Sequence, residues 1–203
     1  MAWRFFTAGG VAQTGEYGEL AANAVTSAKI LDGTIVNADI AAATITNAKL
    51  ATPGIVVQMV NTQTGAVATG TTSIPLDDTI PQITEGDQYM SLAITPKNAS
   101  NILIIEAGVF LSTNTNDRRP IAALFVGSTS NALTVSSSYT ELGTEESSIQ
   151  LMHKMTASVT TELTFTIRAG ANTTQTLTFN GVSASRRFGD IPKSYITITE
   201  FTP

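Results

Sequence analysis

The strongest constraint on how this chain folds is a five-residue repeat between Asn23 and Thr52. It reads NAVTS, AKILD, GTIVN, ADIAA, ATITN and AKLAT. The third residue of every unit is aliphatic; these residues are Val25, Ile30, Ile35, Ile40, Ile45 and Leu50. The first residue is small or nearly so, and a period of ten lies on top of the period of five. A fixed period indicates a chain that folds as a series of similar units.

A period of five fits neither a helix nor a single strand. Each helical residue turns the chain by about 100°, so aliphatic residues five apart would wind around a helix instead of forming one face. A strand places every second residue on the same face. Thr, Val, Ile and Asn are also poor helix formers. The repeat therefore predicts a regularly coiled, extended chain whose aliphatic side chains stack inward.

One row of aliphatic residues has too little partner surface to fold alone, because repeat units need stacked neighbours. Three identical chains around a shared axis would bury the row and leave Lys29, Asp39 and Lys49 in water. We therefore predict a short trimeric shaft over residues 23–54. The alternatives are a short intramolecular solenoid cap and a flexible linker rich in Ala and Thr. The strict aliphatic spacing favours the shaft over a linker.

Residues 1–22 form a separate N-terminal segment in this interpretation. Trp3, Phe5 and Phe6 precede a Gly-rich run, and aromatic side chains are costly to leave in water. They either pack onto their own trimer or insert into another protein, and the Gly-rich run favours the second alternative as a tether. The segment has neither the pattern of a signal peptide nor an apolar stretch long enough to cross a membrane.

Residues 55–203 show the alternation of β-strands separated by turns. Leu163, Phe165 and Ile167 share one face of a strand, and Ile196 and Ile198 share one face of another. The near-continuous apolar run at residues 102–111 predicts a central strand covered on both faces. About eight such strands predict an all-β domain, an antiparallel sandwich or jelly roll.

Composition excludes several classes of function. Only 13% of residues are charged, and the net charge is −5, which argues against a basic surface for nucleic acid. The chain has no cysteine, so it forms neither disulfides nor thiolate metal sites. We expect no membrane insertion and no cofactor.

Four stretches resemble bacteriophage tail-fibre and virion appendage proteins. They are the repeat, residues 57–66 (VQMVNTQTGA), residues 80–90 (IPQITEGDQYM) and residues 195–201 (YITITEF). The resemblance covers most of residues 20–203. It implies a structural protein of the virion, assembled in the host cytoplasm, with a homotrimeric fibre and a C-terminal β-sandwich knob that often touches the host surface. The first nineteen residues fall outside it, so the attachment point is not implied.

The leading hypothesis is a non-enzymatic fibre or receptor-binding appendage, attached to the particle through Trp3, Phe5 and Phe6. Its partners would be two further copies of the chain, another virion protein, and a glycan or protein of the host surface. The close alternative is a capsid decoration protein, either a cement or a head-fibre protein. A tailspike enzyme needs paired carboxylates across a groove, and here the acids cluster in turns. A host lectin is the remaining class. The sequence does not identify the residues that contact a receptor.

Two weaker candidates for chemistry remain in the sandwich region. His153, the only histidine, shares an apolar face with Leu151 and Met155, which predicts a hydrogen-bonded histidine of the core or of an interface. A second candidate is acidic and flanks turns; its residues are Asp77, Asp78, Glu85 and Asp87. Oxygen clusters of this kind suit calcium, but acids are common in turns and a plain solvated loop is the leading interpretation.

Two basic pairs stand out in the acidic chain, Arg118-Arg119 and Arg186-Arg187. They are candidates for an anionic glycan or for ion pairs with a neighbouring chain, and exposed ion pairs contribute only about 0–1 kcal/mol. Tyr139 follows a run of serines and is a candidate for stacking on a sugar, or else for packing at a rim.

Overall fold

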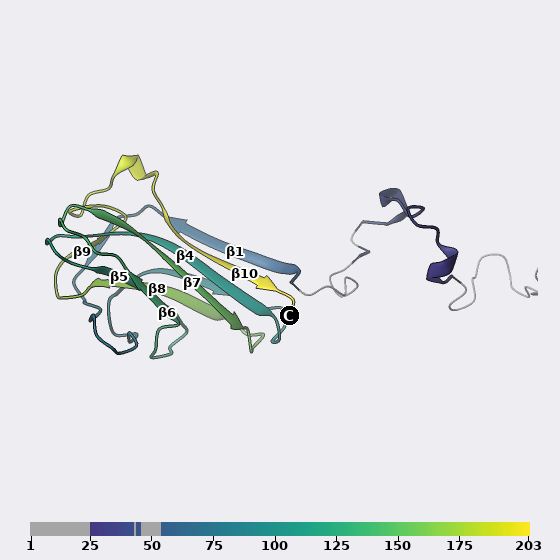
Figure 1. The fold of residues 1–203 in the computed structure, drawn as a ribbon, viewed down its shortest axis with the longest axis horizontal. Helices are drawn as coiled ribbons and strands as arrows, with labels where there is room; N and C mark the ends of the chain where they lie inside the picture. The colour runs from purple at the N-terminus through teal and green to yellow at the C-terminus, as the bar shows by residue number, and fades with distance from the viewer. Residues whose placement is uncertain (1–24, 43, 46–53) are drawn as a thin grey trace, which may run out of the picture. The chain divides into compact units, whose positions relative to one another are not determined.

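The computed structural model describes residues 25–42, 44–45 and 54–203, and the chain divides into two compact units, Met1–Leu50 and Ala51–Pro203 (Figure 1). The predicted anchor residues Trp3, Phe5 and Phe6, and the predicted shaft residue Leu50, lie outside the described residues. The boundaries proposed at residues 22 and 54 stay predictions.

The repeat is a series of hydrogen-bonded turns, one every five residues. The carbonyl groups of Thr26, Leu31, Val36 and Ala41 each accept a hydrogen bond from the N–H three residues later, at 2.9–3.2 Å. The first and third turns are the 3-10 helices η1 (Ser27–Lys29) and η2 (Asn37–Asp39). In the second and fourth turns a Thr hydroxyl also donates to the same carbonyl, at 2.6 Å. The period of ten therefore arises from two alternating kinds of turn.

These turns correct the prediction of an extended chain, because each one folds the backbone back on itself. The described residues of one chain also show no inward stack of the aliphatic side chains. Val25, Ile30, Ile35, Ile40 and Ile45 are all exposed, between 40% and 55%. The aliphatic row therefore has no apolar cover among the described residues of a single chain.

The second unit is built from ten strands. They are β1 (Val56–Thr64), β2 (Ala68–Gly70), β3 (Asp87–Ile94), β4 (Ile102–Thr113), β5 (Pro120–Val126), β6 (Thr134–Ser137), β7 (Glu146–Thr156), β8 (Leu163–Ala171), β9 (Leu177–Phe179) and β10 (Ser194–Phe201). A third described 3-10 turn, η4 (Phe188–Asp190), precedes β10. The all-β prediction is confirmed, and every strand pair is antiparallel.

Apart from the three-residue strands β2 and β9, the strands pair in the order of one long hairpin that is rolled into two sheets. β5 pairs β6, β4 pairs β7, β3 pairs β8 and β1 pairs β10, so each pair encloses the one before it. Rolling then places β10 beside β4 and β8 beside β5. The result is a six-stranded sheet that contains β1, β10, β4 and β7, and a four-stranded sheet in the order β3-β8-β5-β6. This nested order is a jelly roll.

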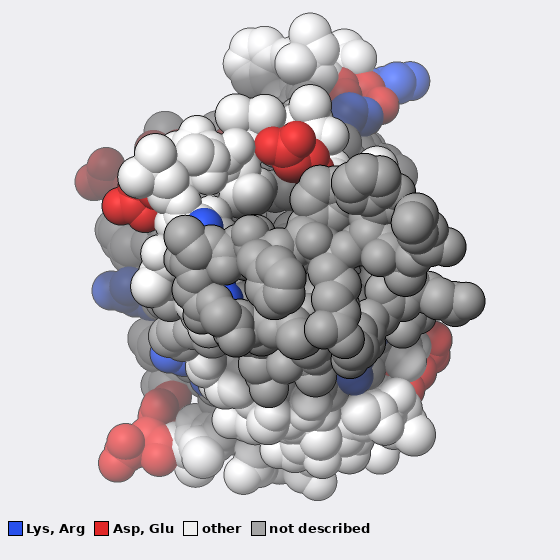
Figure 2. Space-filling view, turned by 90° about the vertical axis from the view of Figure 1, so that its right-hand side faces the viewer, with Lys and Arg blue, Asp and Glu red and all other residues white. Residues whose placement is uncertain are grey.

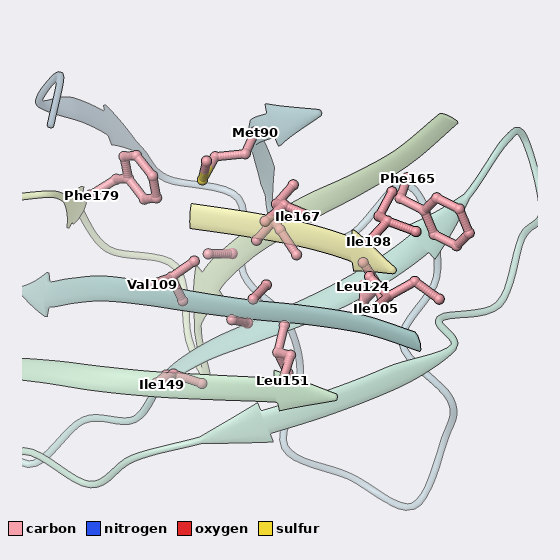
Figure 3. Packing of buried hydrophobic residues seen from close by; sticks show 14 of the residues in the cluster. Met90, Ile105, Val109, Leu124, Ile149, Leu151, Phe165, Ile167, Phe179 and Ile198 are labelled. Carbon is pink, nitrogen blue, oxygen red and sulfur yellow. The ribbon is translucent and has the colours of Figure 1, made fainter. Parts of the chain in front are cut away.

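The core lies between the two sheets. Leu103, Ile105 and Val109 of β4 belong to one buried cluster with Phe165 and Ile167 of β8, and all five are fully buried. Figure 3 shows Ile105, Val109, Phe165 and Ile167 within this cluster. A stacked pair of aromatic rings, Tyr89 and Phe179, joins the same core with ring centroids 4.9 Å apart. Each large apolar side chain buried in this way contributes roughly 1.5–3 kcal/mol to stability.

The strand covered on both faces is β5, not β4 as predicted. In β4 the odd-numbered residues are buried, whereas Glu106 is exposed and Ile102 and Ile104 are only partly buried. In β5, Ile121 and Phe125 face away from the main core and are covered by residues 71–86 through Ile74 and Ile83. The prediction for β4 was wrong because apolar side chains also lie on its outward face.

A buried carboxylate, that of Glu200, connects β10 to neighbouring segments near the C-terminal end of the strand. Glu200 is 0% exposed and accepts hydrogen bonds from Gln58 Nε2 and Asn101 Nδ2, each at 2.5 Å, and from the N–H of Lys97 at 2.8 Å. Burial opposes its ionisation, but these bonds, with a longer one from the N–H of Asn98, outweigh burial and lower the pKa of Glu200. The carboxylate thus joins β10 to β1 and to the β3–β4 connection.

We expect Glu200→Gln to lower the free energy of unfolding by roughly 2–3 kcal/mol, because the amide NH₂ would face donors in place of an acceptor. Since folding lowers the pKa of Glu200 below its ordinary value of 4.5, its contribution is present above that pH and is lost as the pH falls through the folded-state pKa. Urea unfolding at pH 7 and at acidic pH measures both effects. The exposed Glu162→Gln is the control; equal losses in the two variants would contradict the role of Glu200.

Candidate functional site

The candidate site lies at the distal end of the sandwich, which we define as the end where Thr64 of β1 pairs with Ser194 of β10. At the opposite end, the N–H of Gly54 donates to the carbonyl of Thr202 at 3.2 Å, so the chain enters the sandwich there. Figure 1 shows the chain end marked C beside the start of β1, and the yellow-green η4 turn toward the other end.

An open groove of about 810 Å³ lies at the distal end. One wall is the turn after β1, residues 63–67, and the other comes from the loop before β10, residues 181–193, which we call the tip loop. Asn180 joins the two walls: its Nδ2 donates to the carbonyl of Thr64 at 2.8 Å, and its Oδ1 accepts from the Ser194 hydroxyl at 2.6 Å. The groove therefore exists because β1 and β10 are neighbours.

The groove is polar and has an excess of positive charge. Lys193 pairs with Asp190 at 3.7 Å, whereas Arg186 has no ion-pair partner among the described residues. Gln63, Thr64 and Ser185 add amide and hydroxyl groups to the lining. The volume falls within the range of small-ligand sites, roughly 300–1,000 Å³. The lining suits a ligand that carries hydroxyl groups and a negative charge.

The backbone of the tip loop is strained. Ser183, Ala184, Phe188 and Asp190 all have positive φ, between 49° and 75°, a region that favours glycine. Each such residue costs on the order of 1–2 kcal/mol. Strain of this kind persists only where the surroundings enforce it, and it concentrates at binding sites.

The same loop holds two large apolar side chains in water. Phe188 is 75% exposed and Ile191 is 80% exposed. They flank the left-handed Gly189, whose φ of 64° shapes the turn between them. Buried aromatic and aliphatic anchors provide much of the binding energy at protein contacts, so the tip loop has the composition of a contact surface.

The first predicted basic pair and Tyr139 meet at the same end of the sandwich. The Arg119 guanidinium lies 5.4 Å from the centroid of the Tyr139 ring. The Tyr139 hydroxyl donates to Asp117 Oδ1 at 2.7 Å, and this hydrogen bond raises the pKa of Tyr139. Arg118 donates to the carbonyl of Asp117 at 3.0 Å. One face of the tyrosine ring is therefore already occupied by an arginine, which leaves less of it for stacking on a sugar.

His153 lies apart from this site. It is half-buried on β7 on the same face as Leu151, opposite Ile105 of β4. Burial lowers the pKa of His153, so the neutral imidazole is favoured in the fold. The described part of the chain gives the imidazole no hydrogen-bond partner, which differs from the predicted hydrogen-bonded histidine.

Three members of the predicted acidic cluster accept hydrogen bonds from residues of the segment between β2 and β3. Asp77 accepts from the N–H and the hydroxyl of Thr79, and these bonds lower the pKa of Asp77. Glu85 accepts from the N–H of Gln82, and Asp87 accepts from Thr72. Among the residues that the structure describes, no group of three or more His, Cys, Asp or Glu side chains is arranged to hold a metal ion.

Charge elsewhere is sparse. In the coloured parts of Figure 2, red and blue side chains stand apart from one another among uncharged ones. None of the helices in the described segments is long and apolar enough to span a membrane.

No protein-family model matches this chain, and no curated protein matches it. Among solved structures, it is similar to dimeric latent PorU from Porphyromonas gingivalis, at 7% identity and a TM-score of 0.33, over 75% of this chain and 14% of that one. It is also similar to the VP2 subviral particle of infectious bursal disease virus, at 9% identity and a TM-score of 0.34, over 72% of this chain and 40% of that one. These likenesses are too distant to define a function.

We expect Ala184→Gly to raise the free energy of unfolding by about 0.5 kcal/mol, because glycine relieves the left-handed strain at the cost of a more flexible unfolded chain. The control is Ala68→Gly, in the exposed part of β2, which we expect to lose about 0.5–1 kcal/mol. Chemical denaturation measures both variants. A loss of stability in Ala184→Gly equal to that in the control would show that the tip loop is not strained.

Proposed function

We propose that this protein is a non-enzymatic structural protein of a bacteriophage particle, a homotrimeric fibre that contacts the host. The observation that carries the proposal is the row of exposed aliphatic residues, one on each turn of the repeat, with no apolar cover from the described residues of one chain. The described structure supports an all-β fold. The trimer, the phage and the fibre rest on this row together with the resemblance described above.

Association of identical chains explains the aliphatic row. Fully burying one aliphatic side chain is worth roughly 1.5–3 kcal/mol, and these side chains are about half exposed, so each gains part of that on association. Because the turns repeat with a strict period, a second and a third copy present the same row at the same spacing. The number three comes from the resemblance to tail-fibre proteins.

The distal end supports a receptor-binding role. In the groove, Arg186 is a cation that no described carboxylate pairs with, and amide and hydroxyl groups lie around it, which suits an acidic glycan of the host surface. Phe188 and Ile191 extend the contact surface beside it. Three copies would present three such sites, which adds avidity to a weak single contact.

The groove does not favour glycoside hydrolysis. That chemistry needs two carboxyl groups facing each other across the substrate. Asp190 is the single carboxylate among the described residues that line the groove, and it pairs with Lys193. We therefore propose binding without cleavage.

We expect light scattering of the wild-type protein to give three times the chain mass of 21.3 kDa. Ile35→Asp/Ile45→Asp should reduce this to a single chain mass, because six carboxylates would be placed near the shared axis. Leu31→Asp/Val36→Asp is the matched control, with equal added charge in the same repeat at two exposed aliphatic residues outside the row. A wild-type protein that is monomeric at micromolar concentration would contradict the shaft.

We expect deletion of residues 2–7 to leave the trimer folded but to prevent its incorporation into particles, because Trp3, Phe5 and Phe6 are the proposed anchor. The abundance of the protein in purified virions measures the effect, and circular dichroism checks the fold. Immunogold labelling of wild-type particles then distinguishes a tail fibre from a capsid decoration protein. Normal incorporation of the deletion variant would show that another part of the chain holds it on the particle.

A further inference from the structure

The outward face of the six-stranded sheet is open and partly apolar; we call the outward side chains of β1, β10, β4 and β7 the open face. Antiparallel register aligns them in rows across the four strands. The row nearest the chain entry contains Val56, Phe201 and Ile102. Val56 is 52% exposed, and farther along the face Met59 is 65% exposed and Met152 is 66% exposed.

The chain covers the corresponding face of the other sheet with its own backbone. Residues 71–86 pass over the four-stranded sheet and bury Ile121 and Phe125. The carbonyl of Thr72 approaches Gly170 so closely that a Cβ there would lie 2.4 Å from it. Arg168 holds the segment by donating to the carbonyls of Glu85 and Gly86, at 3.1 and 2.7 Å. The exposed Met59 and Met152 show that the segments which the structure describes leave the open face without an equivalent cover.

We infer that the open face is turned toward the axis of the proposed trimer and is covered there by the neighbouring copies of this chain. The first reason is charge. Across the four rows from Val56 to Gln63, the face has one acid and one base, Glu106 and Lys154. Both are exposed, and neither has an ion-pair partner among the described residues. Around a threefold axis, Glu106 of each copy can therefore lie beside Lys154 of the next, so the face adds no charge repulsion between copies.

The second reason is position along the chain. Gly54 and Ile55 donate to Thr202 immediately before β1, so the chain arrives from the repeat at the end of the open face that Val56 and Phe201 occupy. If the repeat gathers three chains, as the proposed function requires, it delivers three open faces close to one another. This inference therefore rests on the proposed trimer.

The third reason is size. Four strands about 4.8 Å apart, with four rows about 6.8 Å apart, give a face of about 400 Å² in projection. A stable interface buries about 800 Å² on each partner. The open face is therefore too small to hold two copies together alone, but it is adequate when a shaft tethers them.

Methionine oxidation tests the inference on the intact protein. Exposed methionines react with hydrogen peroxide much faster than buried ones, and mass spectrometry measures each site separately. We expect Met59 and Met152 in the wild-type trimer to react about tenfold more slowly than in the dissociated Ile35→Asp/Ile45→Asp chain. Met90, which is 5% exposed, should react slowly in both and serves as the internal control.

A second variant separates the open face from the shaft. Thr197 pairs with both Asn61 and Glu106, so Thr197→Lys places a long cation in the middle of the open face. We expect this variant to keep the trimer mass, because the shaft is intact, while Met59 reacts as fast as in the dissociated chain. The control is Leu76→Lys, at a residue that is 60% exposed outside the six-stranded sheet; it should leave Met59 protected.

The outcomes distinguish this inference from the proposed function. A wild-type monomer would contradict the proposed trimer itself. A wild-type trimer in which Met59 and Met152 react as fast as in the dissociated chain would overturn the open-face contact and leave the shaft standing. Protection that survives Thr197→Lys would likewise overturn it.

Discussion

The jelly roll depends on the insertion of β10 between β1 and β4. These two pairings use nearly the whole length of β10, and the buried Glu200 closes the end of the strand with donors from β1 and the β3–β4 connection. Ile55 and Thr202, which bond at this end, are 147 residues apart in sequence. The sheet is therefore complete only when the whole sandwich has closed, and topologies of this kind fold slowly because the pairing is non-local.

The candidate site is a consequence of the same pairing. Because β1 ends where β10 begins, the turn after one and the loop before the other must lie together, and Asn180 joins them. The start of the tip loop is attached through Asn180, and its end continues into β10. The middle of the tip loop has positive φ angles and exposes Phe188 and Ile191. A loop with fixed ends and a strained, exposed centre is well suited to contact a partner without reorganising.

Sequence patterns predicted the strands of the sandwich better than the cover over them. Alternation placed Leu163, Phe165 and Ile167 on one face of β8, whereas the apolar run of β4 predicts cover on both faces and its outward face is only partly covered. The sequence does not distinguish an apolar side chain that packs on a second sheet from one that packs on a loop or on another molecule. In the repeat, the period of five was plain, but its physical origin was a hydrogen-bonded turn and not an extended strand.

The sequence by itself determined the local properties of this protein: the five-residue period, the all-β character, and the position of the apolar stripe along each strand. These follow from neighbouring residues, since side-chain alternation and turn chemistry act over a few positions. Only the tertiary structure decided that Gln63 and Arg186 line one groove and that residues 71–86 cover β5. It also decided that the described residues leave the outward face of the six-stranded sheet open. Those facts depend on which strands become neighbours, and strand order is set by closure of the whole sandwich, which no local pattern encodes.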